Sequence, residues 1–326
     1  MRVVCLAGGV GGAKLADGLA QALEPGELTV VVNTGDDFER HSLAIWPDHD
    51  TVLYTLAGVA DPTQGWGLAG ETWNVMDRLA ELGEDTWFRL GDRDIATHLY
   101  RTERLRRGER PTAIALALAT ALGVRTAILP MSDQPVRTRV RTDDGWLDFQ
   151  DYFVRLHQEP EVREVAYGGV QLATATPEVE AAIAAAEVIV VAPSNPIVSI
   201  GPILAVPGVL EAIREVRARG VAAVGVSGIV GGKALRGPAD RMLAGLGEES
   251  SALGVARRYG RSDVLDGLVI DAVDDELAGS IRGLGFECQS TDTIMTSRES
   301  RRVLAKAVLA FAARIAERKR TEAGIS

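Results

Sequence analysis

The chain has 326 residues, of which 46% are hydrophobic, enough for a large core and for one or two domains. Its formal net charge of −10 opposes nonspecific binding to nucleic acid or anionic membranes. The longest nearly uncharged apolar stretch, residues 113–124, is too short to span a bilayer, and the N-terminus does not read as a signal peptide. Cys5 and Cys288 are far apart and have no metal-like spacing, which favours free thiols and a reducing, cytoplasmic compartment. From the net charge we expect no nucleic-acid or membrane partner.

The first elements are predicted to be a strand, a glycine-rich turn, a helix and a second strand. Residues 2–7 are apolar, residues 8–12 are mostly glycine, and residues 13–23 have helical periodicity. The second strand, residues 28–32, is almost continuously apolar, which is typical of a parallel sheet covered on both faces. A polar loop, residues 33–37, follows this strand.

The middle of the chain is predicted to be mainly helical and then to change character. The expected helices are two within 50–83, one at 95–107 and one at 112–122, followed by a strand at 124–130. From 136 to 156 apolar and polar residues alternate around a turn at 143–145, which predicts a β-hairpin-containing insertion within 131–170.

The last part of the chain returns to alternating strands and helices. The expected strands are 188–192, 221–226 and 268–272, and the expected helices are 177–186, 204–219, two within 239–259, and 297–318. This alternation predicts an α/β fold, with one doubly wound, Rossmann-like, mostly parallel sheet in a single large domain spanning 1–326.

The glycine run at residues 8–12 is a candidate phosphate site. Glycine lets the backbone approach a phosphate, and the following helix would point its free N–H groups at it. Lys14 is flanked by Ala13 and Leu15, so the segment is not a Walker A loop. The alternative is a tight turn that packs the helix on the strand.

Four carboxylates follow the second strand closely: Asp36, Asp37, Asp48 and Asp50. Gathered at one sheet edge they would repel one another unless a cation or substrate donors neutralised them, and oxygen ligands suit Mg²⁺ bridging a diphosphate. The alternative is that some of them cap helices, with Asp50 as an N-cap. His49 is either a base or a structural side chain.

Residues 87–94 combine two aromatic residues with alternating acids and arginines. Arg89 or Arg93 could clamp phosphates in a bidentate manner, with Asp92 or Asp94 orienting the guanidinium group. The alternative is a surface Asp–Arg network leading into the next helix. His98, one turn later, is expected to pack within that helix.

Two later loops also carry polar groups at the ends of strands. Ser194, Asn195 and Pro196 follow the strand at 188–192, at the sheet edge where ligands bind in open α/β folds, although a plain connection is the alternative. Lys233 and Arg236 lie in a glycine-rich loop after another strand and offer a second phosphate contact, or are simply exposed loop charges.

Taken together, these segments resemble the CofD family, called FbiA in some bacteria, the 2-phospho-L-lactate transferases of coenzyme F420 biosynthesis. The segments that carry the resemblance are 8–14, 33–37, 47–56, 65–67, 71–74, 87–98, 192–202 and 232–237. The resemblance implies a transferase that moves a phospho-acyl group from a guanosine diphosphate donor to the terminal ribityl hydroxyl of the deazaflavin Fo and releases GMP. It leaves open whether the donor carries lactate, enolpyruvate or glycerate.

The resemblance also implies roles for individual residues. Asp36 and Asp50 are the catalytic candidates, and Mg²⁺ would be held among Asp36, Asp37, Asp48 and Asp50. Asp50, Arg89 and Asp48 are the candidate Fo contacts, so Asp50 serves either the metal or the substrate. The candidate nucleotide and phosphate contacts are Gly9, Gly11, Gly12, Lys14, Arg93, Ser194, Asn195, Pro196, Lys233 and Arg236. A homodimer is the family expectation.

Two other classes of function stay open on the sequence. A nicotinamide-dependent oxidoreductase is suggested by the glycine-rich turn and the acids after the second strand, although the spacing does not match the dinucleotide fingerprint. A regulatory protein that binds nucleotide-sugars is suggested by the wider CofD-like superfamily, although residues 87–98 favour the transferase.

Overall fold

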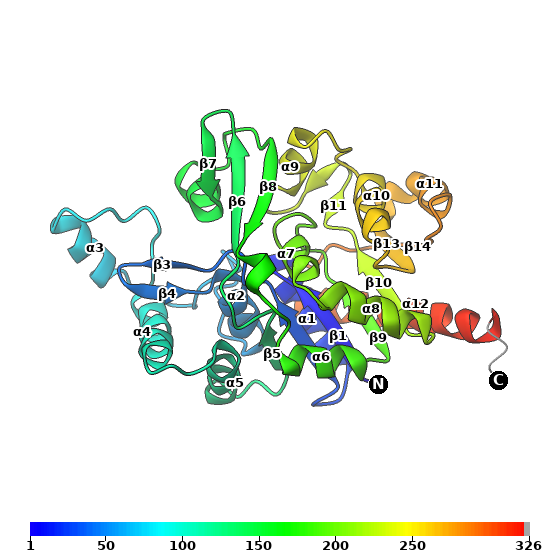
Figure 1. Ribbon diagram of the computed structural model, residues 1–326, viewed down its shortest axis with the longest axis horizontal. Helices are drawn as coiled ribbons and strands as arrows, with labels where there is room; N and C mark the ends of the chain where they lie inside the picture. Colours follow the sequence, from blue (N-terminus) through cyan, green and yellow to red (C-terminus); the bar gives the residue numbers. More distant parts are fainter. Residues whose placement is uncertain (323–326) are drawn as a thin grey trace.

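The computed structural model describes residues 1–322, and its centre is a seven-stranded sheet in which every neighbouring pair is parallel (Figure 1). The strand order is β14-β13-β10-β9-β1-β2-β5. From β1, strands β2 and β5 extend the sheet in one direction. The later strands β9, β10, β13 and β14 extend it in the other. The strands are β1 (Val3–Ala7), β2 (Leu28–Val32), β5 (Ala127–Pro130), β9 (Val188–Val191), β10 (Ala222–Val226), β13 (Gly267–Asp271) and β14 (Glu287–Thr291).

Helices cover both faces of this sheet because its strands are apolar on both faces. Along β1, Val3 and Cys5 point into one buried layer and Val4 and Leu6 into the other, as the two-residue period of a strand requires. The first layer is covered by α1 (Gly9–Ala22), α2 (Pro47–Leu56), α5 (Pro111–Ala121) and α12 (Arg298–Glu322). The second is covered by α6 (Pro177–Ala184), α7 (Ile200–Ala205), α8 (Val209–Ala218), α10 (Ala252–Ser262) and α11 (Ala278–Arg282).

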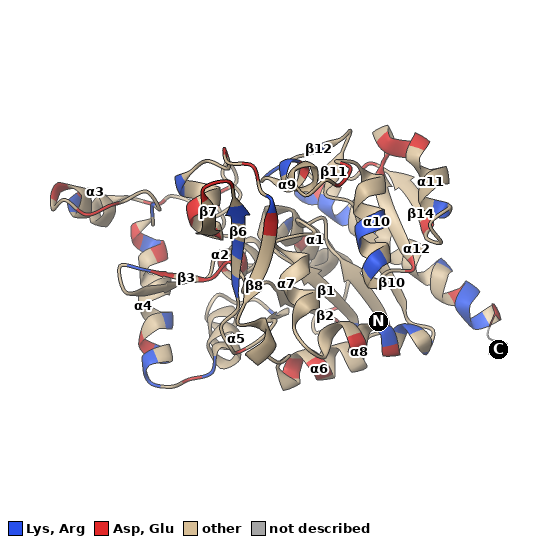
Figure 2. Cartoon of the chain, turned by 45° about the horizontal axis from the view of Figure 1, so that its top comes forward, with Lys and Arg blue, Asp and Glu red and all other residues tan. Residues whose placement is uncertain are grey.

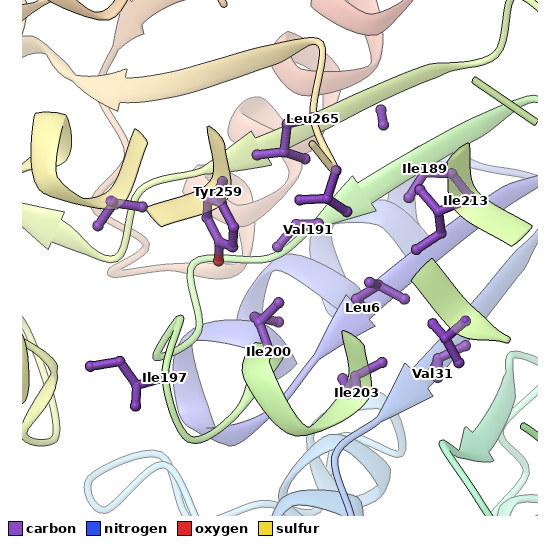
Figure 3. Packing of buried hydrophobic residues seen from close by; sticks show 14 of the residues in the cluster. Leu6, Val31, Ile189, Val191, Ile197, Ile200, Ile203, Ile213, Tyr259 and Leu265 are labelled. Atoms are coloured by element: carbon purple, nitrogen blue, oxygen red, sulfur yellow. The ribbon is translucent and has the colours of Figure 1, made fainter. Parts of the chain in front are cut away.

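The second layer shows how the two halves of the sheet, which meet at β1 and β9, share one core. Leu6 on β1 and Val191 on β9 lie beside Ile200 and Ile203 of α7, with Tyr259 of α10 nearby (Figure 3). All five side chains are buried. Burying a side chain such as Leu or Ile stabilises the folded state by about 1.5–3 kcal/mol. This layer therefore holds the two strands in place, and with them the loops at their carboxyl ends.

A three-stranded antiparallel sheet stands above the carboxyl edge of the main sheet (Figures 1 and 2). It consists of β6 (Arg137–Thr142), β7 (Gly145–Asp148) and β8 (Glu164–Gly168), in the order β7-β6-β8. Along β6, arginines alternate with the buried Thr138, Val140 and Thr142, so one face packs inward and the other is charged. A π-helical turn, η1 (Asp151–Arg155), follows β7.

Part of the segment between β2 and β5 forms a lobe that extends to one side of the sheet (Figure 1). It contains a hairpin, β3 (Phe38–Arg40) with β4 (Leu43–Ile45), and the helices α3 (Asn74–Glu81) and α4 (Asp92–Arg106). Asp92 fastens α4 to the loop before α3, since its carboxylate accepts hydrogen bonds from Thr72 Oγ1 (2.6 Å) and from the backbone N–H of Val75 (3.0 Å). These bonds, led by that from Thr72, lower the pKa of Asp92 to about 2.

Short elements complete the chain. They are η2 (Val170–Leu172), β11 (Ile229–Val230), β12 (Lys233–Ala234), α9 (Ala239–Gly245) and η3 (Ala272–Leu277). Within residues 1–322, no helix is both long and apolar enough to cross a membrane.

The fold class predicted from the sequence is confirmed, and so are most of the expected elements. Several details differ. The first helix begins at Gly9, inside the glycine run, whereas a start at residue 13 was expected. The helix expected over 204–219 is two helices, α7 and α8, because Pro207 and Gly208 separate them. The β3–β4 hairpin and the edge strand β14 were not expected at all.

Candidate functional site

The candidate site lies where the order of strands reverses, between β1 and β9. Loops that leave two such neighbouring strands in opposite directions open a crevice at the carboxyl edge of the sheet. A cavity of about 540 Å³ occupies this position. Its walls come from the turn after β1, the loop after β2 with α2, and the start of α4 with the segment before it. The loop after β9, the turn after β7 in the antiparallel insertion and the loop before α9 complete them.

The glycine-rich turn is held against the loop after β9. Gly9 has φ +61°, a backbone conformation that residues other than glycine rarely adopt. A side chain at Gly11 would overlap the carbonyl oxygen of Pro193. Ser194 clamps the turn, since its Oγ accepts from the N–H of Gly8 (3.1 Å) and donates to the carbonyl of Gly8 (2.7 Å). Ser194, expected to contact phosphate, thus uses its hydroxyl proton to hold Gly8.

Asp48 connects the acidic loop to this turn. Its Oδ1 accepts from the N–H of Gly9 (2.8 Å) and its Oδ2 from Asn33 Nδ2 (2.9 Å). Burial raises the pKa of Asp48 to about 6, although these two hydrogen bonds act in the opposite direction. The carboxylate therefore both positions the start of α1 and brings negative charge to the cavity wall.

Asp36 lines the same wall, and its neighbours do not fully offset its negative charge. Burial, followed by repulsion from Asp48 and Asp37, raises its pKa well above the usual range. Its Oδ1 is buried and has no hydrogen-bond partner among residues 1–322. Asp37 is also buried with a raised pKa, caused first by burial, but it does not line the cavity.

Asp50 behaves in the opposite way because Arg101 lies against it. α2 begins at Pro47, so Asp50 is inside the first turn, and the alternative that it is an N-cap is wrong. Burial acts to raise the pKa of Asp50, but the ion pair with Arg101 and the contact with His49 outweigh it and lower the pKa to about 2. His49 Nδ1 lies 3.2 Å from Asp50 Oδ1, and burial lowers the pKa of this histidine.

Asp50 also belongs to a group of three side chains that could hold a metal ion. Asp50, Asp94 and His98 each offer one ligand atom, and these atoms all lie within 4.8 Å of one another. Tyr54 Oη donates to Asp94 Oδ1 at 2.6 Å. All four residues line the cavity, so His98 does more than pack within α4.

Arg89 is the one cation of the 87–94 segment that lines the cavity. Its guanidinium carbon lies 5.0 Å above the Trp73 ring, and Nη2 donates to Asp77 Oδ1 at 2.7 Å. Arg93 points elsewhere and donates to the carbonyl of Ala69 (2.7 Å). The expectation that Asp92 or Asp94 orients these arginines is wrong, since Asp92 holds the α3 loop and Asp94 faces Tyr54 and His98.

The insertion supplies an aromatic wall that the sequence did not single out. Phe149 and Phe153 are stacked, with ring centroids 5.5 Å apart and planes 6° apart, and both line the cavity beside Gln150. The π-helical turn that carries Phe153 is a local widening of a kind often found at functional sites. The repeated aromatic residues at 149, 152 and 153 are the only signal of this wall in the sequence.

The other predicted contacts divide into two groups. Gly9, Gly11, Asn195 and Arg236 line the cavity, and Arg236 also donates to the carbonyl oxygens of Thr63 and Gln64. Outside the lining lie Gly12, Lys14, Pro196 and Lys233. Lys14 Nζ donates to the carbonyl of Met295 (3.0 Å), and burial, then Arg301 and Arg236, lower its pKa.

The chain is similar to known proteins over most of its length. The model of the family described as "2-phospho-L-lactate transferase CofD" matches residues 3–308. A phosphoenolpyruvate transferase from Streptomyces griseus is 44% identical over 317 residues, which cover 96% of this chain and 98% of the relative. A 2-phospho-L-lactate transferase from Methanosarcina mazei is 39% identical over 307 residues, covering 94% and 99%.

The fold has a solved counterpart at low sequence identity. The crystal structure of a UPF0052 family member from Bacillus halodurans superposes with a TM-score of 0.64 at 15% identity, covering 94% of this chain and 98% of that one. At this identity the likeness concerns the fold alone.

A doubly wound sheet with a glycine-rich turn and buried carboxylates at its switch point is typical of α/β enzymes that act on phosphate-bearing substrates. Within that class, this chain belongs to the CofD family. The resemblance expected from the sequence is thereby confirmed, and the transferase is preferred to the oxidoreductase and to the nucleotide-sugar regulator.

Proposed function

We propose that the protein transfers an enolpyruvyl phosphate group from a guanosine diphosphate donor to the terminal ribityl hydroxyl of Fo and releases GMP, in coenzyme F420 biosynthesis. The observation that carries the proposal is a single cavity, which joins the glycine-rich turn and buried carboxylates on one side to a polar and aromatic half on the other. Several relatives named phosphoenolpyruvate transferases are 42–44% identical, compared with 39% for those named 2-phospho-L-lactate transferases, which supports the enolpyruvyl donor.

The donor half of the cavity is assigned to the diphosphate. Gly9 and Gly11 bring backbone to the cavity wall at the N-terminal end of α1, where the helix favours negative charge. Arg236 also lines the cavity and brings a positive charge to it. Asn195 Oδ1 accepts from the N–H of Ile197 (2.9 Å), which turns the loop after β9 toward the cavity.

The same half fits a divalent cation. Asp36 Oδ1 is buried without a hydrogen-bond partner in the described part of the chain, and Asp36 and Asp48 repel each other across the cavity wall. Oxygen donors of this kind suit Mg²⁺. We assign Mg²⁺ to Asp36 and Asp48, where, when bound, it would offset the charge of the diphosphate and of the leaving GMP.

The acceptor half is assigned to Fo. Asp50 and Arg89 supply charged contacts, and Phe88 and Phe153 supply apolar ring surface. Stacked or edge-on aromatic contacts contribute about 0.5–1.5 kcal/mol each beyond their buried area, which suits a flat tricyclic ring. Cytoplasmic location and a homodimer stay predictions, and the two free, buried cysteines are compatible with a reducing compartment.

The test is a transfer assay with purified protein, Fo and each of three guanosine diphosphate donors, which carry enolpyruvate, lactate or glycerate. We expect Mg²⁺-dependent GMP release and a phosphodiester product, detected by mass spectrometry, with the highest kcat/KM for the enolpyruvyl donor. A higher kcat/KM for the lactyl donor would overturn the choice of acid. Absence of transfer from all three, with Fo and Mg²⁺ present, would overturn the proposed function.

A further inference from the structure

Arg101 is the largest side chain that is completely buried in the described part of the protein, and it lies directly behind the acceptor half of the cavity. Its guanidinium carbon is 4.3 Å from the centre of the Trp46 ring, and Nη1 lies 3.1 Å from the carbonyl oxygen of Ala44. Nη2 donates to Asp50 Oδ1. The planar group is therefore held between an aromatic ring, the backbone of β4 and a carboxylate, and its orientation is fixed.

The same guanidinium group determines the tautomer of His98. Nη1 of Arg101 lies 3.1 Å from Nδ1 of His98. A guanidinium group only donates hydrogen bonds, so Nδ1 accepts when it pairs with Arg101, and this arrangement leaves Nε2 to carry a ring proton. A proton on Nδ1 would face the Arg101 N–H across 3.1 Å, and the carboxylate oxygen on that side, Asp50 Oδ2, lies 3.7 Å away, beyond ordinary hydrogen-bond distance.

Two polar atoms at the cavity wall, one donor and one acceptor, are left without a hydrogen-bond partner in the described part of the chain. His98 Nε2 and Asp50 Oδ2 are buried, and neither has a hydrogen-bond partner among residues 1–322. The carboxylate oxygen nearest to Nε2 is Asp94 Oδ2, at 3.4 Å, while Tyr54 occupies Asp94 Oδ1. One N–H donor and carboxylate acceptors thus converge, and a hydroxyl group, which both accepts and donates, is the simplest partner for such a set.

We propose that Arg101 is a positioning residue that makes the Asp50, Asp94 and His98 group a seat for a hydroxyl group of the acceptor. In this seat the hydroxyl accepts from His98 Nε2–H and donates to Asp50 Oδ2. Only the identity of the hydroxyl, as one of the polyhydroxylated ribityl chain of Fo, rests on the proposed function. The tautomer of His98 and the seat itself rest on the geometry of this group.

This arrangement opposes a metal centre with an imidazole ligand at the same place. Histidine ligands usually donate their second ring N–H to a carboxylate or carbonyl, which leaves the other nitrogen free for the metal. In His98 the second nitrogen faces a donor, so ligation through Nε2 would require the ring to lose its proton or Arg101 to move. The three side chains have metal-like spacing, but Arg101 gives the histidine the wrong tautomer for it.

The tautomer is measured directly on the unmodified protein by ¹⁵N-histidine NMR, with the His98 signals assigned by their loss in His98→Gln. We expect the pattern of a neutral ring protonated at Nε2. A ring protonated at Nδ1, or at both nitrogens, overturns the proposal. Zn²⁺ alone is then added, and the Nε2–H signal of His98 is expected to stay in place. Loss of that proton on Zn²⁺ binding would identify an imidazole metal ligand and overturn the seat.

Kinetics test the positioning role. In Arg101→Met we expect the KM for Fo to rise about 10- to 100-fold, the range typical when a supporting partner of a site is removed, while the KM for the donor changes less than about twofold. Arg101→Lys should recover part of the Fo affinity, because it restores the charge but not the fork that reaches both Asp50 and His98. Arg106→Met, an exposed arginine on the same helix, is the matched control.

Folding is monitored separately, since Arg101→Met leaves Asp50 buried and unpaired. The double variant Arg101→Met/Asp50→Asn removes both charges, and its circular dichroism shows whether the fold survives the loss of the pair. Equal changes in both KM values, or none, would overturn the positioning role. Absence of transfer in the unmodified protein, with the Nε2–H signal present, would instead remove the proposed function and leave the tautomer standing.

Discussion

Asp36 and Asp50 have the same side chain and line the same cavity, but their surroundings give them opposite properties. Asp36 is buried beside two other carboxylates, and its pKa is raised, first by burial and then by their repulsion. Asp50 is equally buried, but Arg101 holds its charge and its pKa falls to about 2. A carboxylate that lacks a counter-charge is suited to bind a cation, whereas one that already has a cation is suited to position a substrate.

This contrast gives a prediction for Asp36. Asp36→Asn should lower kcat/KM by at least about 100-fold and abolish activation by Mg²⁺, because one anionic oxygen ligand is lost. The measurement is the rate of transfer as Mg²⁺ is varied, with Glu39→Gln, an exposed acid on β3, as the control. Full activity with an unchanged Mg²⁺ requirement would show that Asp36 does not hold the metal.

Arg89 offers a second prediction at the same scale. Arg89→Ala should raise the KM for Fo by about 10- to 100-fold, since hydrogen bonds to charged groups contribute about 1.5–3 kcal/mol. Binding is followed through the fluorescence of Fo, and the affinity for GDP should not change. Arg78→Ala, which removes an exposed arginine of α3 paired with Glu81, is the control. Equal Fo affinity in both variants would exclude Arg89 from the acceptor site.

At the scale of elements, the cavity depends on how closely α1 approaches the loop after β9. Gly11 lies in the first turn of α1, and a methyl group there would overlap the backbone of Pro193. Ser194 and Asp48 then hold the same turn from two sides through Gly8 and Gly9. The glycine run is therefore needed for loop packing as well as for any approach of a phosphate.

A pair of glycine substitutions tests this dependence. Gly11→Ala should destabilise the protein by about 1–3 kcal/mol, because the neighbouring backbone must shift, and should also lower transfer activity. Gly279→Ala in α11 meets no atom within 4 Å and has helical geometry, so it should be neutral or stabilising by up to about 1 kcal/mol. Thermal unfolding of both variants decides the point, and equal melting temperatures would contradict the packing argument.

The elements themselves were predictable where their signal is local. Apolar runs such as 28–32 and 188–192 identified central strands, because a strand buried on both faces needs no pattern beyond its own residues. The hairpin β3–β4 was missed, since its three-residue strands are too short for a period to show. Edge strand β14 was missed because four of its five residues, Glu287, Gln289, Ser290 and Thr291, are polar.

The residues of the site also divide into those that could be predicted from the sequence and those that could not. Asp36 and Asn195 lie in the loops after β2 and β9, so the topology of a parallel sheet is enough to bring them together. Asp48 and Asp50 lie in the first turn of α2, which follows the β3–β4 hairpin. Arg101 and Phe153 could not be found in this way. Arg101 reaches Asp50 from the third turn of α4, and Phe153 reaches the cavity from an inserted sheet, so both contacts depend on the packing of elements distant in sequence.

For the whole molecule, the two cysteines occupy a central strand and an edge strand of the same sheet. Cys5 is in β1, which has a strand on each side, and burial raises the pKa of its thiol to about 12. Cys288 is in the edge strand β14, and burial raises the pKa of its thiol as well. Edge elements open through local fluctuations, whereas a central strand is exposed only when the domain unfolds.

Thiol labelling of the native protein at pH 8 should therefore proceed in two phases. Cys288 should react through local opening, at least about ten times faster than Cys5, and only the slow phase should accelerate with low urea concentrations as steeply as global unfolding does. Cys288→Ala should remove the fast phase and leave the slow one. If Cys5 reacted as fast as Cys288, or without this dependence on urea, the central strand would be opening locally, and the two helix layers would not form one cooperative core around β1.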